Sequence, residues 1–142
     1  MKYLLETCVI SELIKSGSNE KVAAWIEERK EEDLFISVLT IGEIYKGISK
    51  LPDSRKKESI QAWVNDDLRK RFEGRILEIT EEIAAKWGEI QGIAEKDGKR
   101  MPVIDSLIAA TAIKNDLTIV TRNVKDIESS GCKTFNLWKD DE

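Results

Sequence analysis

The 142-residue sequence contains no histidine, only two cysteines and only two prolines. The absence of histidine excludes Ser-His-Asp and Cys-His catalysis, an imidazole general base and histidine-ligated zinc. Cys8 and Cys132 lie far apart in the sequence, so they indicate neither a disulfide framework nor a zinc site. Any chemistry must therefore come mainly from carboxylates, amides, hydroxyls, lysine and arginine.

The sequence also lacks a long apolar run. Glu6 interrupts the N-terminal apolar stretch too early for a signal peptide, and no segment approaches the ~20 apolar residues of a membrane span. These absences predict an intracellular, cytoplasmic protein without a membrane segment. The 27 acidic residues outnumber the 23 basic ones, giving a net charge of −4. This balance argues against nucleic-acid binding by bulk charge alone, although a local basic groove stays open.

Short apolar runs alternate with longer amphipathic stretches, and the length favours one domain over residues 1–142. Strands are expected at residues 3–5, 34–37, 75–79, 117–120 and 133–135. Helices are expected at residues 9–14, after a cap at Asn19, from Thr40 onward, and at 52–72, 80–96 and 102–115. Strands that alternate with helices predict an α/β fold with a parallel sheet and helices on both faces. Such sheets bind ligands beyond the carboxyl ends of their strands.

Most acidic residues belong to solvated helix faces, but three lie within apolar runs. Glu6 directly follows the first expected strand, whereas Glu43 and Asp105 lie at the front of later helices. Each has an ordinary structural interpretation: Glu6 could cap a helix, and the other two could favour the positive end of a helix. Together, however, all three can reach the same edge of a parallel sheet. We therefore expect them to converge.

A further polar segment follows the fourth expected strand. It contains Thr121, Arg122 and Asn123, with Asp126 three residues further on. Two carboxylates ~6 Å apart repel by about 3 kcal/mol at an effective dielectric constant near 20, so a cluster must take up protons or bind a cation. A set of oxygen ligands without histidine or cysteine suits Mg²⁺ or Mn²⁺ rather than zinc. Such a site can activate water against a phosphodiester.

Four stretches around these residues carry a family resemblance, in an order that spans nearly the whole chain: LLETCVISEL at 4–13, SVLTIGE at 37–43, IDSLIAATA at 104–112 and IVTRN at 119–123. They resemble the PIN-domain ribonucleases of the VapC type, which are toxins of toxin–antitoxin pairs, and the pattern is most similar to a FitB-like branch. The resemblance implies an α/β/α sandwich on a parallel sheet, a homodimer, and Mg²⁺-dependent endonucleolytic cleavage of RNA. It also implies a cognate antitoxin whose C-terminal segment blocks the site.

The resemblance transfers the catalytic positions of the family to Glu6, Glu43, Asp105 and Asn123. The first three would hold the metal ion, with Asp126 as an additional candidate ligand. The hydroxyl positions near the metal fall on two threonines, Thr7 and Thr121.

Glu6 departs from the family pattern, which normally has aspartate at this position. The additional methylene moves the carboxylate oxygens outward by more than ~1 Å, whereas Mg²⁺ requires near-ideal octahedral geometry. The sequence is therefore compatible with an attenuated ribonuclease and with a catalytically silent PIN module that binds antitoxin and RNA without cleavage. A phosphoacceptor receiver domain is disfavoured, because such a domain would have adjacent acids after the first strand and Glu6 stands alone.

An acidic ribonuclease needs local positive charge to bind RNA. Lys46 lies three residues after Glu43 and should share its helix face. Arg122 lies beside the expected site, although an ion pair within the fold is an alternative for it. The helices around Ile44, Ile48 and Trp63 could present an apolar groove, where the resemblance places the antitoxin.

Overall fold

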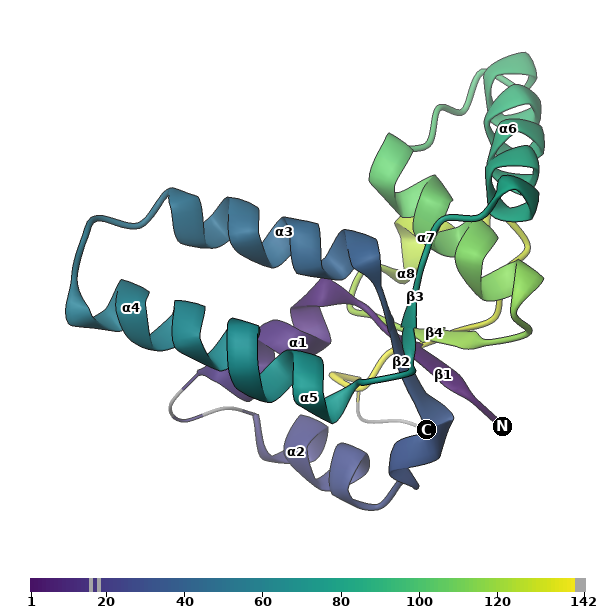
Figure 1. Cartoon of the computed structure of the whole chain (residues 1–142). Helices are drawn as coiled ribbons and strands as arrows, with labels where there is room; N and C mark the ends of the chain where they lie inside the picture. The colour runs from purple at the N-terminus through teal and green to yellow at the C-terminus, as the bar shows by residue number, and fades with distance from the viewer. Residues whose placement is uncertain (16, 18, 140–142) are drawn as a thin grey trace.

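The computed structural model describes residues 1–15, 17 and 19–139. Its centre is a five-stranded sheet with the strand order β3-β2-β1-β4-β5 (Figure 1). Every pair of neighbouring strands is parallel, as the sequence predicts. The strands are β1 (Tyr3–Leu5), β2 (Leu34–Ser37), β3 (Ile76–Leu77), β4 (Thr118–Val120) and β5 (Thr134–Phe135).

Helices cover both faces of this sheet, which confirms the expected α/β/α architecture (Figure 1). The first face carries α1 (Thr7–Ile14), α2 (Glu20–Glu27), α3 (Val38–Ser49), α4 (Arg55–Ala62) and α5 (Arg69–Arg71). The second face carries α6 (Glu81–Lys96), α7 (Val103–Lys114) and α8 (Val124–Glu128). A 3₁₀ turn (Glu31–Asp33) precedes β2, and a π-helix (Trp63–Leu68) joins α4 to α5. Within the described ranges, no helix has the length and apolar character that crossing a bilayer requires.

The two faces have separate apolar cores because successive strand residues point to opposite sides of the sheet. Leu5 and Val120 pack in the core beneath α1 and α3, whereas Leu4 and Ile119 pack in the core beneath α6 and α7. All four side chains are almost completely buried. The central strands β1 and β4 are therefore apolar on both faces, which explains why they read as continuous apolar runs rather than as alternating patterns.

Several helix starts agree with the sequence. The Asn19 side chain accepts the backbone N–H of Lys21 at 2.8 Å, and the Thr80 hydroxyl accepts that of Ile83 at 3.2 Å. Both are typical N-caps, in which a side-chain oxygen pairs with a free N–H of the first helical turn. The cap expected at Asn19 is confirmed, and Thr80 caps the helix that was expected over residues 80–96.

Other boundaries differ from expectation. The first helix begins at Thr7, two residues before its expected start, with Glu6 in the N-cap position. Helix α3 begins at Val38, before the expected Thr40, because the Ser37 side chain accepts the backbone N–H of Leu39 at 3.0 Å. As a consequence, Glu43 lies in the second turn of α3 rather than at its front.

Further along the chain, the expected start at Pro52 is replaced by a helix that begins at Arg55. There the Ser54 side chain accepts the backbone N–H of Lys57 at 3.2 Å. Likewise Pro102 occupies the N-cap position of α7 rather than its first turn. The third strand is shorter than residues 75–79. It pairs only with β2, and its last partner is Ser37, after which the chain turns into α3. Strand β3 therefore ends at Leu77, because β2 offers no further residue to pair with.

An ion-pair network joins the start of β2 to the end of the α4–α5 segment. Arg71 donates to the Glu31 carboxylate through Nε at 2.8 Å and through Nη2 at 3.0 Å. Arg75 donates to the Glu31 carbonyl at 2.6 Å and lies over the ring of Phe72, 5.0 Å from its centroid. The hydrogen bond from Arg71 is the main reason that the pKa of Glu31 lies below its usual value of 4.5.

We expect Glu31→Gln to lower the free energy of unfolding at pH 7 by about 0.5–1 kcal/mol, because the Glu31 side chain is half-exposed and solvent screens the pair. A depressed folded-state pKa stabilises the protein above the unfolded pKa, and this contribution disappears as the pH falls through the folded value. Urea unfolding should therefore show a smaller difference between the variant and the parent at pH 3 than at pH 7. Glu73→Gln, at an exposed acid without an ion pair in the described chain, is the control. An equal effect of Glu31→Gln at both pH values would contradict this account.

Candidate active site

The three acids from the apolar runs lie at one edge of the sheet. Glu6 follows the last residue of β1, Glu43 lies on the helix that follows β2, and Asp105 lies in the first turn of α7. Strands β2, β1 and β4 are neighbours and parallel, so their carboxyl ends meet at the same edge. The topology therefore brings together residues that are about 100 positions apart in sequence.

Glu6 is buried in the floor of this site, with 6% of its surface exposed. Its Oε1 accepts a short hydrogen bond from the fully buried Thr121 hydroxyl and lies 3.5 Å from the Cys8 thiol, which also donates to it. The side chain makes no capping bond to α1, so helix capping does not explain its position. Burial raises the pKa of Glu6, the two hydrogen bonds oppose this shift, and the charges of Asp105 and Glu43 raise the pKa further.

Glu43 approaches the site from α3. The Thr7 hydroxyl donates a short hydrogen bond to Glu43 Oε1, and it lies 3.5 Å from the hydroxyl of the buried Thr40. No acidic residue lies in the first turn of α3, so attraction to the positive end of this helix does not account for Glu43. Thr7 instead links the beginning of α1 to the Glu43 carboxylate.

Asp105 is half-buried at the positive end of α7. Burial is the main reason for its raised pKa, and the charges of Asp126 and Glu43 add to the effect. Asp126 is exposed in the first turn of α8. Glu6, Glu43, Asp105 and Asp126 thus form a chain of carboxylates in which neighbours repel, and no cationic group of the described residues lowers the pKa of Glu6 or Asp105.

The donor chemistry of this edge fits a hard divalent cation, because carboxylate and hydroxyl oxygens are the ligands that Mg²⁺ and Mn²⁺ prefer. The uncompensated negative charge points in the same direction. The spacing is open, however: among the described residues, no three carboxylate or cysteine side chains are close enough to hold a metal ion as they stand. These residues therefore supply the negative charge and the oxygen ligands that such a cation requires, but the described side chains do not surround a metal position.

Asn123 lies beside this group, at the N-cap position of α8. Its backbone N–H donates to the Thr121 hydroxyl at 2.9 Å, and its exposed side chain makes no capping bond. Thr121 thus connects two of the expected site residues: it accepts from Asn123 and donates to Glu6.

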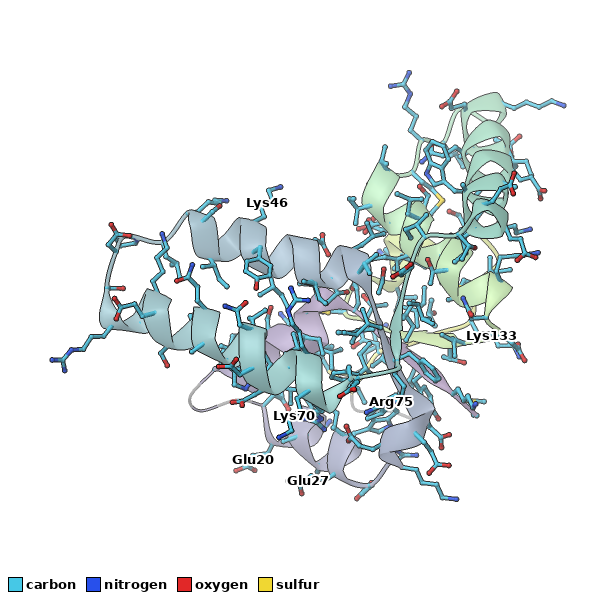
Figure 2. The ribbon with its side chains drawn as sticks, in the orientation of Figure 1. Glu20, Glu27, Lys46, Lys70, Arg75 and Lys133 are labelled. Carbon is cyan, nitrogen blue, oxygen red and sulfur yellow. The ribbon has the colours of Figure 1, made fainter. Side chains whose placement is uncertain are left out.

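The two basic candidates for RNA binding differ in their surroundings. Lys46 is exposed on the outer side of α3 and makes no ion pair within the described chain (Figure 2). Arg122 is already engaged: its Nη2 lies 3.5 Å from Glu12 Oε2, and its Cζ lies 4.3 Å from the ring centroid of Trp138. The alternative of an ion pair within the fold therefore holds for Arg122.

Sequence reasoning did not assign Cys8, Thr40 and Glu12 to this region. Burial raises the pKa of the Cys8 thiol to about 11, so it is a neutral hydrogen-bonding group rather than a nucleophile. The position of Cys8, two residues after Glu6 and on the same helical turn, was a usable signal. Glu12 contacts Arg122 across 110 positions, and no local pattern could have revealed this pair.

A groove of ≈ 790 Å³ begins at Thr7 and Glu43 and runs between α1, α3 and α4. Its walls are largely apolar and include Ile44, Ile48 and Ile60, while Lys15 and Lys56 also line it. Two of the three residues around which an apolar groove was expected, Ile44 and Ile48, line it, whereas Trp63 packs against the core. Glu43 therefore belongs both to the group of acids and to a groove that has largely apolar walls and two lysines.

This fold is that of a PIN domain. The family model for the PIN domain matches residues 3–127, and the chain belongs to this family. It is similar to toxin FitB of Neisseria gonorrhoeae, with 34% identity over 137 residues that cover 96% of this chain and 99% of FitB. It is also 28% identical to the VapC ribonuclease Y4jK of Sinorhizobium fredii, covering 96% and 97% of the two chains.

Solved structures give the same relationship. A structure of FitAB bound to an IR36 DNA fragment has a TM-score of 0.91 and 32% identity, covering 99% of this chain and 98% of that one. A structure of VapBC2 from Rickettsia felis bound to a promoter DNA fragment has a TM-score of 0.80 and 27% identity, covering 98% and 100%. The resemblance inferred from the sequence motifs is confirmed.

Proposed function

We propose that the chain is a metal-dependent endoribonuclease toxin of a type II toxin–antitoxin system, with Mg²⁺ or Mn²⁺ as its cofactor and with residues 1–142 acting as one domain. The observation that carries this proposal is the set of repelling carboxylates from Glu6, Glu43 and Asp105 at the carboxyl edge of the sheet. Membership of the PIN family and similarity to proteins named VapC ribonucleases support the reaction class.

Each side chain has a defined part in this proposal. Glu6, Glu43 and Asp105 would hold the cation, which supplies Lewis-acid and water-activating chemistry for phosphodiester hydrolysis. Thr7 and Thr121 orient Glu43 and Glu6 through their hydroxyls. Asn123 occupies the fourth catalytic position, and the exposed Asp126 is the additional candidate ligand. Lys46 would pair with an RNA phosphate close to Glu43.

We expect RNA cleavage to disappear in excess EDTA and to return on addition of Mg²⁺ or Mn²⁺ but not of Zn²⁺, because the ligand set contains only oxygen. The measurement is the cleavage rate of a fluorescent RNA by purified protein. The Asp105→Asn variant, purified in the same way, is the control for contaminating nuclease: any cleavage by that preparation comes from a contaminant. Cleavage that persists in EDTA while the Asp105→Asn preparation is inactive would refute metal dependence.

A silent PIN module that binds antitoxin and RNA without cutting is the second candidate. The observation that favours it is Glu6, whose Oε1 is turned into the protein towards Thr121 and Cys8. In either case the proposed protein partner is a cognate antitoxin. Its segment would lie in the groove of α1, α3 and α4 and would cover the entrance at Glu43. FitAB and VapBC2 are themselves described as assemblies bound to DNA, which supports a protein partner for this chain.

We further expect a two-fold homodimer, since closed two-fold assembly is the commonest form of soluble oligomers and the family resemblance implies it. Light scattering at micromolar concentration should give twice the mass of the chain. A monomer mass over the whole concentration range would contradict this prediction.

A further inference from the structure

The segment after β4 carries two expected site residues, Thr121 and Asn123, with Arg122 between them. The Thr121 hydroxyl donates to Glu6, and the Asn123 N–H donates to the Thr121 hydroxyl at 2.9 Å. The Arg122 side chain, in contrast, contacts a carboxylate and an aromatic ring outside the acidic site. The contacts that hold the Arg122 side chain therefore also restrain the adjacent Thr121 and Asn123.

The carboxylate is that of Glu12 on α1, which is only 5% exposed. Acidic side chains are seldom buried without partners, and Glu12 has three. Its Oε1 accepts the Asn19 N–H at 2.8 Å, and its Oε2 lies 3.3 Å from Lys15 Nζ and 3.5 Å from Arg122 Nη2. The Asn19 bond is the main reason that the pKa of Glu12 is lowered. Glu12 is therefore a fixed, ionised anchor that belongs to α1 and the start of α2.

The aromatic partner is Trp138, which follows β5. The guanidinium carbon of Arg122 lies 4.3 Å from the centre of the indole ring, a distance typical of a cation–π contact. Trp138 is half-buried, its backbone N–H donates to Asn136 Oδ1 at 2.8 Å, and the preceding Leu137 is buried. The segment that carries the Trp138 ring is thus held in place as well.

The backbone of the same residue is also tied to α1. The Arg122 N–H donates to Cys8 Sγ at 3.4 Å, and the Cys8 thiol donates to Glu6 Oε1. Arg122 therefore joins α1, the segment after β4 and the segment after β5 around the buried carboxylate of Glu6.

We propose that Arg122 is a positioning residue, which locks residues 121–123 against Glu12 and Trp138 so that the Thr121 hydroxyl holds Glu6 in place, and that it does not bind RNA. The planar guanidinium can pair with a carboxylate and stack on an indole at the same time, which a lysine cannot do. Half of its side-chain surface is exposed, but its directional contacts are used within the fold. The kinetic consequence of this proposal rests on the proposed ribonuclease activity.

The first test compares Arg122→Gln, Glu12→Gln, the double variant and Lys133→Gln. Lys133 is an exposed lysine near β4 and β5, so its replacement is a matched loss of one positive charge (Figure 2). Gln at position 12 keeps an acceptor for the Asn19 N–H. Either single change should lower kcat on RNA by about tenfold or more, since a displacement of ~1 Å in an active site costs up to ~100-fold. KM and the salt dependence should stay unchanged.

The double variant should lose no more than the more severe single variant, because both changes break the same Glu12–Arg122 pair. Lys133→Gln should behave like the parent protein. A phosphate contact would give a different pattern: Arg122→Gln would raise KM and reduce the slope of log affinity against log salt by about 0.7, as for one contact to a single strand. Glu12→Gln would then be as active as the parent. That pattern would overturn the positioning role.

The second test does not require activity. Amide exchange of the Glu12→Gln protein, followed by NMR, should be about tenfold faster or more at Arg122 and Asn123, because their bonds to Cys8 and Thr121 open locally. The Thr121 amide, which donates to the Phe135 carbonyl at 3.0 Å, should exchange as in the parent. Unchanged exchange at both Arg122 and Asn123 would overturn the inference. If the parent protein cleaves no RNA, the proposed function fails and amide exchange alone decides the role of Arg122.

Discussion

Replacing Asp105 with asparagine is expected to lower RNA cleavage at saturating Mg²⁺ by about 100-fold or more, the scale seen when one charge-stabilising group is removed from an active site. Asp105 is the half-buried acid of α7, and besides its burial the charges of Asp126 and Glu43 raise its pKa. Asparagine retains the size and one oxygen but removes the negative charge that would hold the cation. The measurement is the single-turnover cleavage rate of a defined RNA.

The same variant should fold at least as stably as the parent when metal is absent. The pKa of Asp105 is raised in the folded protein, so its ionised form at pH 7 opposes folding, and removal of the charge relieves this effect. Asp97→Asn is the matched control, since Asp97 is an exposed residue at the C-cap of α6. A cleavage rate for Asp105→Asn within about threefold of the rate for Asp97→Asn would show that Asp105 lies outside the machinery, given that one decade corresponds to ~1.4 kcal/mol.

Shortening Glu6 to aspartate is expected to raise metal-dependent RNA cleavage by about tenfold or more, which corresponds to at least ~1.4 kcal/mol in the barrier. The argument is geometric, because the two side chains carry the same charge. Glu6 directly follows β1, and its Oε1 accepts from Thr121 and Cys8. Loss of one methylene would withdraw the carboxylate from Cys8 and bring it back towards β1, where the family normally has an aspartate.

Growth inhibition on expression without antitoxin should increase in parallel with the cleavage rate. Adding Asp105→Asn to the Glu6→Asp protein should abolish the gain, because it removes the charge of a neighbouring ligand. The unfolding free energy should change little. Equal cleavage rates for the parent and Glu6→Asp, at saturating Mg²⁺ and with matched folding, would mean that the site already accommodates the longer side chain. No cleavage by either protein, together with binding of RNA, would favour the silent PIN module.

The layered architecture and the neighbourhood of the candidate site follow from patterns in the amino-acid sequence. The short apolar runs at residues 3–5 and 117–120 predict buried strands, and parallel strands bring their carboxyl ends to one edge. An acid within an apolar run needs an explanation wherever it occurs, so Glu6, Glu43 and Asp105 could be recognised locally. Their assignment as metal ligands stays a prediction.

The hydrogen-bond partners of these acids and the ends of the helices and strands depend instead on contacts between distant parts of the folded chain. The end of β3 depends on where β2 turns into α3, and the burial of Glu6 depends on Thr121 across 115 positions. Arg122 is a second example. Its place beside the site residues in the sequence suggests RNA binding, but in the folded chain its guanidinium contacts Glu12 and Trp138. Hydrogen bonds and ion pairs between distant segments have no sequence period. The strand and helix patterns arise from the local periodicity of burial and can therefore be read in advance, whereas such pairings form only when the chain is folded.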